Sequence, residues 1–140
     1  MDTTRTRRVK GLEEKEALLM TEIKTSRDEK AKNRCNQLFQ LGLVNIKLGN
    51  YQKARELLVR VFNCLKMREG VMSDQVLIVR MHLGDLHMLN FETEEAGAIY
   101  ESILMTMAER KEGPNWEIYA EIRQRIVDLD GYFEKSSFTG

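Results

Sequence analysis

The sequence matches itself at an offset of 42 residues. Gln40-Leu41-Gly42 recurs as His82-Leu83-Gly84, and Ala54 recurs as Ala96. Self-similarity at a fixed period of roughly 20–50 residues is typical of architectures in which each repeat buries its apolar face against the next. The offset therefore predicts stacked helical hairpins, with these small residues at the points where two helices of a hairpin touch.

The apolar residues of the second hairpin helix follow helical spacing in both copies. In the first copy they recur at i, i+3, i+4 and i+7, which is the pattern of a buried helical face. Each of them is matched by an apolar or aromatic residue 42 positions later. No stretch alternates with a period of two, so the sequence predicts no strands. The matched pairs are Ala54 and Ala96, Leu57 and Ile99, Leu58 and Tyr100, Val61 and Ile103, Phe62 and Leu104, and Leu65 and Met107.

Glycine, proline and capping residues divide the chain into six predicted helices. The stop signals are Gly49-Asn50, Gly70 and Gly113-Pro114, and the candidate N-caps are Ser73 or Asp74 for the fourth helix and Asn115 for the sixth. The predicted spans are 11–32, 33–48, 51–68, 73–90, 93–109 and 115–133.

Both ends of the chain break the repeat. One offset further along, the Leu-Gly centre becomes Arg125-Ile126, and too few residues follow for a partner helix. One offset earlier, an apolar stripe falls where a second hairpin helix should lie. The members of this stripe are Leu12, Leu19, Met20 and Ile23. The terminal helices are therefore predicted to cap the repeats.

The predicted architecture is all-α, with two antiparallel helical hairpins between an N-terminal and a C-terminal capping helix. A single helical-repeat domain covers residues 11–133. A basic flexible arm over residues 1–10 precedes it, and a frayed tail over residues 134–140 follows it. A chain of 140 residues is long enough for one such domain with its own core.

Composition narrows the classes of function. Lys and Arg together number 22, as do Asp and Glu, so no overall field favours nucleic acid or an anionic membrane. No apolar run approaches the roughly 18 residues of a membrane span, and residues 1–10 lack the apolar core of a signal peptide. Cys35 and Cys64 fall within helical patterns instead of a cysteine-rich framework, which favours reduced thiols and a cytoplasmic location.

The residues around the first Leu-Gly pair carry a family resemblance. Leu41-Gly42, Gly49-Asn50-Tyr51 and Ala54 follow the order Leu-Gly, Gly-x-Tyr, Ala, which resembles the tetratricopeptide repeat. The second copy departs from it at Phe91 and Thr93, where Gly and Tyr are usual. The period is longer than the usual length of about 34 residues. This longer form is similar to the repeats of kinesin light chains and of spindle-orientation adaptors.

The resemblance implies a concave groove formed by one face of each first hairpin helix. A groove that carries Phe, Leu, Ile and Met suits an amphipathic helix or an extended apolar peptide. Its occupant is a protein or peptide partner, the chain's own residues 11–32 or 115–133, or a second molecule in a self-associated array. The groove residues are Asn36, Phe39, Leu43, Ile46 and Lys47 in the first copy and Ile78, Met81, Asp85, Met88 and Leu89 in the second.

Two ligands known for this family fit the groove residues poorly. Co-chaperones of the family grip a terminal carboxylate with Lys, Asn and Arg. The corresponding positions here are Phe39, Leu43, Met81 and Asp85. None of them offers a charge-assisted bond to a carboxylate. Kinesin light chains usually carry asparagine before the Leu-small pair, where this chain has Gln40 and His82.

The sequence assembles neither a catalytic nor a metal site. His82 and His87 lie five residues apart, so on a helix their side chains point about 140° apart. Asp85 lies between them, but zinc would need further ligands that the pattern does not supply. There is no Ser-His-Asp or Cys-His set and no glycine-rich phosphate loop. We therefore predict no enzyme activity and no cofactor.

The predicted function is that of a non-enzymatic protein-interaction module, either an adaptor or a small subunit of a larger complex. The alternative is a regulatory module that contacts nucleic acid or another anionic surface through the N-terminal arm. The candidate contacts of that arm are Arg5, Arg7, Arg8 and Lys10. The ordinary interpretation of such a cluster is a solvated chain end.

Overall fold

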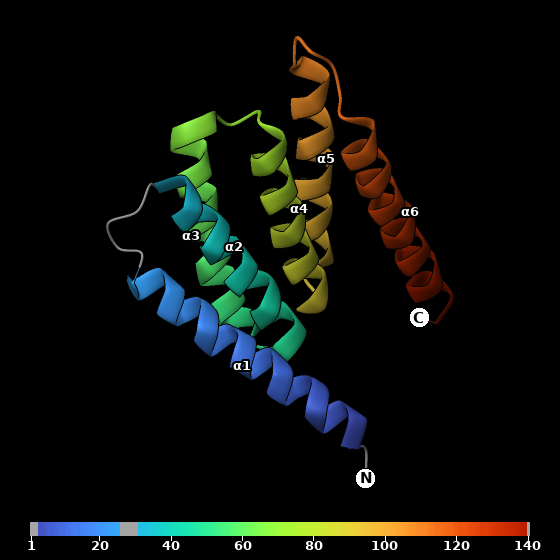
Figure 1. Ribbon diagram of the computed structural model, residues 1–140. Coiled ribbons are helices and arrows are strands. Elements are labelled where there is room, and N and C mark those ends of the chain that lie inside the picture. Colours follow the sequence, from blue (N-terminus) through green and yellow to red (C-terminus); the bar gives the residue numbers. More distant parts are fainter. Residues whose placement is uncertain (1–2, 26–30, 140) are drawn as a thin grey trace. The chain divides into compact units, whose positions relative to one another are not determined.

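The computed structural model describes the backbone of residues 3–25 and 31–139, and the side chains of residues 6–23 and 33–131. All secondary structure in these ranges is helical, and none of the described residues lies in a strand (Figure 1). The all-α prediction is confirmed. The helices are α1 (Thr3–Thr25), α2 (Ala31–Leu48), α3 (Tyr51–Glu69), α4 (Asp74–Leu89), α5 (Thr93–Glu109) and α6 (Trp116–Thr139).

The chain forms two compact units, Met1–Leu65 and Lys66–Gly140. The first contains α1, α2 and most of α3, and the second contains the last residues of α3 together with α4, α5 and α6. Within each unit, consecutive helices run in opposite directions and form hairpins (Figure 1). The division falls inside the predicted domain of residues 11–133, and each unit buries side chains of its own.

In the first unit, Gly42 allows α2 and α3 to approach closely. A Cβ atom at this position would lie 2.9 Å from Leu58 Cδ2, which is closer than real Cβ atoms come. The predicted role of the Leu41-Gly42 pair as a contact between helices is confirmed. Helix α1 packs against α2. The buried apolar side chains of this unit are Cys35, Leu38, Leu41, Val44, Ala54, Leu57, Leu58 and Val61.

In the second unit, Gly84 has the same role between α4 and α5. A Cβ atom there would lie 2.6 Å from Tyr100 Cε1. Helix α6 packs against both α5 and α4, and Leu129 approaches Gly97 from α6. The core of this unit therefore draws on three helices. It consists of Leu77, Met81, Ala96, Tyr100, Ile103, Met107, Ile118 and Ile122.

The turns that close the two hairpins share one backbone conformation. Gly49 has a φ of 82°, and Phe91, which lies 42 residues later, has a φ of 61°. The Gly49 N–H donates to the Ile46 carbonyl at 3.1 Å, and the Phe91 N–H donates to the Met88 carbonyl at 3.1 Å. This is the left-handed helix ending that glycine usually provides. The sequence match at this offset is therefore a match of structure as well.

A side-chain hydrogen bond also recurs across these turns. Asn50 Nδ2 donates to Asn45 Oδ1 at 3.3 Å, and 42 residues later His87 Nδ1 lies 3.3 Å from Glu92 Oε1. The backbone N–H groups of Asn50 and Glu92 donate to the Asn45 and His87 carbonyls at 2.9 and 2.8 Å. Different residue types thus perform one task, because each pair joins the end of one helix to the beginning of the next.

Two helix beginnings follow the predicted caps. Val76 N–H donates to Ser73 Oγ at 3.2 Å, so Ser73 caps α4. Ile118 N–H donates to Asn115 Oδ1 at 3.3 Å, so Asn115 caps α6. Asp74, the other candidate cap for α4, accepts a hydrogen bond from Asn115 Nδ2 at 2.9 Å instead. The start of α4 and the start of α6 are therefore joined within the second unit.

The terminal helices are longer than the sequence predicts. The flexible arm expected over residues 1–10 is helical from Thr3 onward, because residues 3–10 contain neither glycine nor proline to interrupt α1. The frayed tail expected over residues 134–140 is helical to Thr139, since the chain has a single proline, Pro114, before α6 begins.

The cysteines are paired, which corrects the prediction of reduced thiols. Cys35 of α2 and Cys64 of α3 form a disulfide, with Cα atoms 6.1 Å apart, and no free cysteine remains. Helical spacing indicates that each lies on a packed face or at its margin, but spacing alone does not say that two residues meet. Because disulfides persist mainly in oxidising compartments, the cysteines no longer favour a cytoplasmic location.

Candidate functional site

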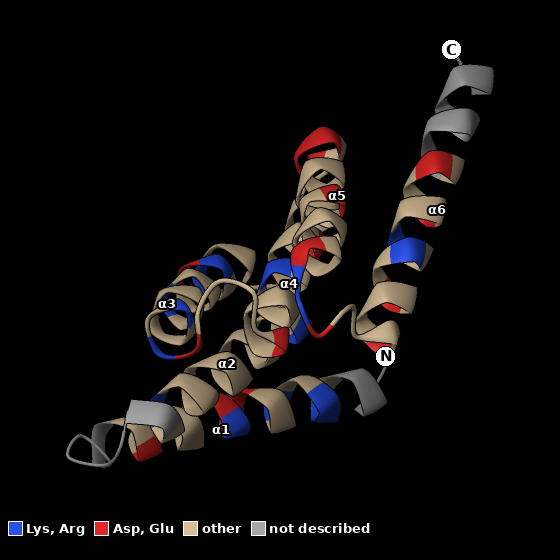
Figure 2. Ribbon diagram, turned by 90° about the horizontal axis from the view of Figure 1, so that it is seen from above, with Lys and Arg blue, Asp and Glu red and all other residues tan. Residues whose placement is uncertain are grey.

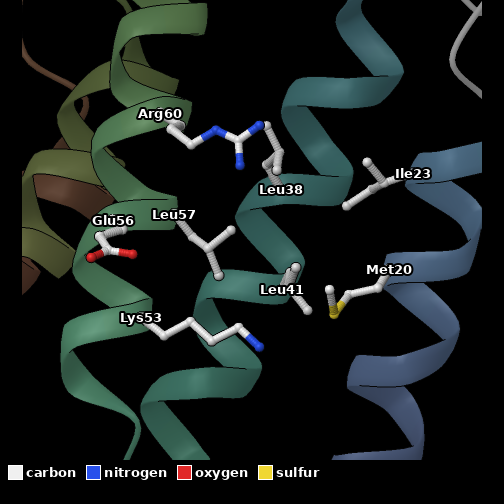
Figure 3. Close-up of a pocket in the computed structure, with 8 residues that line it drawn as sticks. All are labelled: Met20, Ile23, Leu38, Leu41, Lys53, Glu56, Leu57 and Arg60. Atoms are coloured by element: carbon white, nitrogen blue, oxygen red, sulfur yellow. The ribbon is translucent and has the colours of Figure 1, made fainter.

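A cavity of about 280 Å³ lies among α1, α2 and α3 in the first unit (Figure 3). Its walls are apolar and its rim carries charge. The buried part comes from Leu38, Leu41 and Leu57, while Met20 is 39% exposed at the mouth. The residues that form it are Met20, Ile23, Leu38, Leu41, Lys53, Glu56, Leu57 and Arg60.

Helical spacing brings these side chains to one place. Residues three, four or seven positions apart lie on the same face of a helix, so each helix contributes one stripe. The stripe of α1 is Met20 and Ile23, that of α2 is Leu38 and Leu41, and that of α3 is Lys53, Glu56, Leu57 and Arg60. The packing of α1 against α2 closes the cavity on one side.

The rim of the cavity carries charges of both signs, from Lys53, Glu56 and Arg60. Lys53 and Arg60 extend from α3 toward α2 (Figure 3). Lys53 forms an ion pair with Glu16 of α1, and Glu56 accepts a hydrogen bond from Gln52 at 3.3 Å. Among the described residues, Arg60 has neither an ion pair nor a hydrogen-bond partner. Its guanidinium is therefore available to an anionic group beside the apolar cavity.

The sequence did not predict this cavity. Its apolar signal is the stripe that includes Met20 and Ile23, which by itself indicates only the packing face of a capping helix. Lys53 and Arg60 have the pattern of ordinary surface charges of α3. A cavity formed by three helices depends on how α1 lies against α2, and periodicity within a single helix does not contain that information.

The groove residues predicted for the first copy lie on α2, at positions other than those of the cavity residues Leu38 and Leu41. Asn36 and Lys47 are exposed, whereas the three apolar members are half-buried. Those three are Phe39, Leu43 and Ile46. None of the five belongs to the residues that form the cavity.

The groove residues predicted for the second copy are mostly used within the unit. Met81 is only 4% exposed and belongs to the same core as Ile118 and Ile122 of α6. Ile78 and Met88 pack against that core, and Leu89 is exposed. The prediction that Met81 lines an open groove is therefore wrong, because Met81 is buried in a core that includes residues of α6. Burial by the chain's own residues 115–133 is the alternative that the sequence left open.

Asp85, another predicted groove residue, is held by α6. Arg125 donates to both carboxylate oxygens, from Nε at 2.8 Å and from Nη2 at 3.0 Å, and Tyr100 Oη donates at 2.6 Å. The hydrogen bond to Asp85 raises the pKa of Arg125. Burial, together with the hydrogen bond to Asp85, raises the pKa of Tyr100. Arg125, which interrupts the Leu-Gly pattern, thus holds α6 on the hairpin.

The two histidines belong to separate contacts. His82 Nδ1 lies 3.9 Å from Asp85 Oδ2, and burial lowers the pKa of His82. His87 contacts Glu92 at the turn. Within the described ranges, no three His, Cys, Asp or Glu side chains are grouped so that they could hold a metal ion.

The basic residues near the N-terminus lie on α1. Arg7, Arg8 and Lys10 are exposed, and the side chain of Arg5 lies outside the described residues. Acidic residues follow them along the helix, so that blue and red segments both occur on α1 (Figure 2). In the part of the chain that the structure describes, no helix is both long enough and apolar enough to span a bilayer.

Comparisons with protein-family models, with curated proteins and with solved structures found no match.

Proposed function

We propose that this chain is a non-enzymatic protein-interaction module, either an adaptor or a small subunit of a larger complex, that binds an amphipathic or apolar segment of a protein. The cavity among α1, α2 and α3 is the observation that carries the proposal. Its volume of about 280 Å³ is close to the lower end of the roughly 300–1,000 Å³ of typical small-molecule pockets. A cavity of this size suits one or two anchoring side chains of a partner, as at the centre of protein interfaces.

The charges at the rim indicate what should flank the anchor. Arg60 has no acidic partner of its own among the described residues, and a buried apolar contact beside it would lower the local dielectric. A carboxylate next to the anchor would then form a charge-assisted hydrogen bond with the guanidinium. We therefore propose a segment with a large apolar residue followed or preceded by Asp or Glu.

We further propose that the chain is a tetratricopeptide-like repeat protein with long repeats. The shared turn conformation at Gly49 and Phe91 and the close helix contacts at Gly42 and Gly84 support this assignment. The half-buried and exposed groove positions of the first copy provide a second candidate contact for a partner. They are Asn36, Phe39, Leu43, Ile46 and Lys47.

Selection from a random peptide library tests the proposal even though the partner is unidentified. Peptides of about 12 residues would be displayed and selected on the full chain, on an Arg60→Glu variant and on an Arg68→Glu control. Arg68 is exposed on the same helix and does not belong to the cavity. We expect enrichment of peptides that combine Phe, Leu, Ile or Met with Asp or Glu, and an affinity about tenfold lower for Arg60→Glu.

Two outcomes would contradict this function. One is that no peptide is enriched. The other is that enriched peptides bind variants of both candidate surfaces, Arg60→Glu and Met20→Glu at the cavity and Phe39→Glu and Leu43→Glu on α2, as tightly as the unaltered chain. If the enriched peptides bind but require Phe39 or Leu43 instead, the interaction function holds and the proposed site moves to the groove of α2.

Two alternatives make separate predictions. Contact of Arg5, Arg7, Arg8 and Lys10 with nucleic acid or another anionic surface predicts binding that weakens steeply as salt increases. A cytoplasmic location predicts free thiols at Cys35 and Cys64 in the cell, in contrast to the disulfide of the structure.

A further inference from the structure

The turn between α4 and α5 exposes a large apolar side chain in an unfavourable conformation. Phe91 is 82% exposed, and its φ of 61° is the one positive value at a residue other than glycine in the part of the chain that is described. An aromatic residue in the left-handed region is strained, and its exposure to water adds a second cost. Leu89, two residues earlier, is 43% exposed.

Acidic residues lie directly after this apolar tip. Glu94 and Glu95 form the first turn of α5, and both are exposed. Neither has an ion pair or a hydrogen-bond partner among the described residues. We call Leu89, Phe91, Glu94 and Glu95 together the Phe91 turn. It combines an apolar anchor with flanking carboxylates, which is the chemistry that the cavity among α1, α2 and α3 is proposed to bind.

We propose that the Phe91 turn of one molecule docks into the cavity among α1, α2 and α3 of a second copy of this chain. Phe91 would enter the apolar cavity, and Glu94 or Glu95 would meet Arg60 at the rim. The inference rests on the proposed function, because it requires that the cavity accept a protein segment. Charge complementarity between Arg60 at the cavity and Glu94 and Glu95 beside Phe91 supports a second copy as the occupant, and only docking between molecules depends on protein concentration.

This contact joins two different surfaces, so it does not close on itself. A molecule whose cavity is filled still presents a free Phe91 turn, and its partner still presents a free cavity. Such head-to-tail contacts produce rings or open chains of molecules instead of a symmetric dimer. Self-association should therefore continue past the dimer as the protein concentration rises.

Sedimentation velocity over a range of concentrations tests the inference. We expect the unaltered chain to form dimers and larger species, and Phe91→Gly or Arg60→Glu to weaken association about tenfold or more. Met105→Gln removes another exposed apolar side chain, and Arg68→Glu removes another exposed charge of α3. Both controls should associate like the unaltered chain. Phe91→Gly relieves the strained backbone, so unfolding of that variant does not explain a loss of association.

A mixture of two variants makes the test specific for head-to-tail docking. Phe91→Gly lacks the anchor but keeps the cavity, whereas Met20→Glu with Arg60→Glu keeps the anchor but lacks a suitable cavity. Each should be monomeric alone, and their equimolar mixture should form a dimer that grows no further. Exchange of charges, with Arg60→Glu combined with Glu94→Lys and Glu95→Lys in one chain, should restore association.

An unaltered chain that is monomeric at every concentration overturns the inference, and so does self-association that persists in Phe91→Gly. If the chain is monomeric at every concentration but library peptides bind and require Arg60, the proposed function holds and the partner is a different protein. The absence of both self-association and peptide binding would remove the inference and the proposed function together.

Discussion

At the scale of single residues, the two glycines at the helix contacts face different neighbours. A Cβ atom at Gly42 would lie 2.9 Å from Cδ2 of the Leu58 side chain. Gly84 meets the ring of Tyr100, whose hydroxyl donates to Asp85 and whose body is buried. The same substitution should therefore have different consequences at two positions that the repeat makes equivalent.

We predict that Gly84→Ala lowers the free energy of unfolding by about 1–2 kcal/mol, because overpacking outweighs the gain in helix propensity. Gly42→Ala should lower it by less than about 1 kcal/mol, since the closest contact of an added Cβ there is 2.9 Å, against 2.6 Å at Gly84. Urea titration followed by circular dichroism measures both values. If Gly42→Ala and Gly84→Ala change the free energy of unfolding equally, the contact with the Tyr100 ring does not make Gly84 the more sensitive position.

A second prediction concerns Phe91. Its φ of 61° is unfavourable for any residue with a Cβ atom, so Phe91→Gly should raise the free energy of unfolding by about 1 kcal/mol. Asn90 provides a matched control, because its φ of −98° is ordinary. Asn90→Gly should instead lower stability by roughly 0.5–1 kcal/mol. The free energies of unfolding of both variants are measured at a protein concentration at which the chain is monomeric. A lower stability of Phe91→Gly would show that the backbone at Phe91 is not strained.

At the scale of helices, the disulfide joins α2 to α3. Cys35 and Cys64 are 29 residues apart in sequence, so the bond restricts the unfolded chain and should stabilise the first unit by about 3–4 kcal/mol. Reduction should therefore lower the unfolding midpoint, and a Cys35→Ala, Cys64→Ala variant should be insensitive to reductant. Two free thiols in the purified, oxidised chain would contradict the pairing.

One ion pair with α4 contributes to the attachment of α6, beside the apolar contacts of Ile118 and Ile122. Arg125→Ala removes both hydrogen bonds to Asp85, and we expect a loss of about 1–2 kcal/mol because the pair is only partly buried. Amide exchange along α6 should accelerate, and Met81 should become more accessible. Arg123→Ala is the control, since Arg123 is exposed and makes no ion pair within the described residues. Similar exchange in both variants would contradict this role of Arg125.

At the scale of the whole molecule, residue spacing in the sequence predicted the structural features that recur at the 42-residue offset. The positions of Gly42 and Gly84, the apolar faces of α3 and α5 and the caps Ser73 and Asn115 could all be identified from spacing, because each depends on neighbours close in sequence. The same reasoning related Gly49 to Phe91, although glycine and phenylalanine differ in their conformational preferences.

Other features depend on how helices lie against one another, and local patterns do not encode them. Arg125 meets Asp85, 40 residues earlier, only because α6 packs over α4. Cys35 and Cys64 form a bond only because two helical faces meet in one rotation. The cavity requires three helices at once. The contact of α6 with α4 covers part of the predicted groove, and the cavity among α1, α2 and α3 provides a different candidate site.

Docking of a protein segment in the cavity among α1, α2 and α3 is tested by locating a bound peptide on the chain. Methyl resonances of the eight methionines would be followed in an isotope-labelled chain while a library-selected apolar and acidic peptide is added. If the segment docks in the cavity, the resonance of Met20 at its mouth should shift in proportion to occupancy, and that of exposed Met105 of α5 should not. Peptide binding that leaves Met20 unchanged would contradict the assignment of the cavity as the docking site.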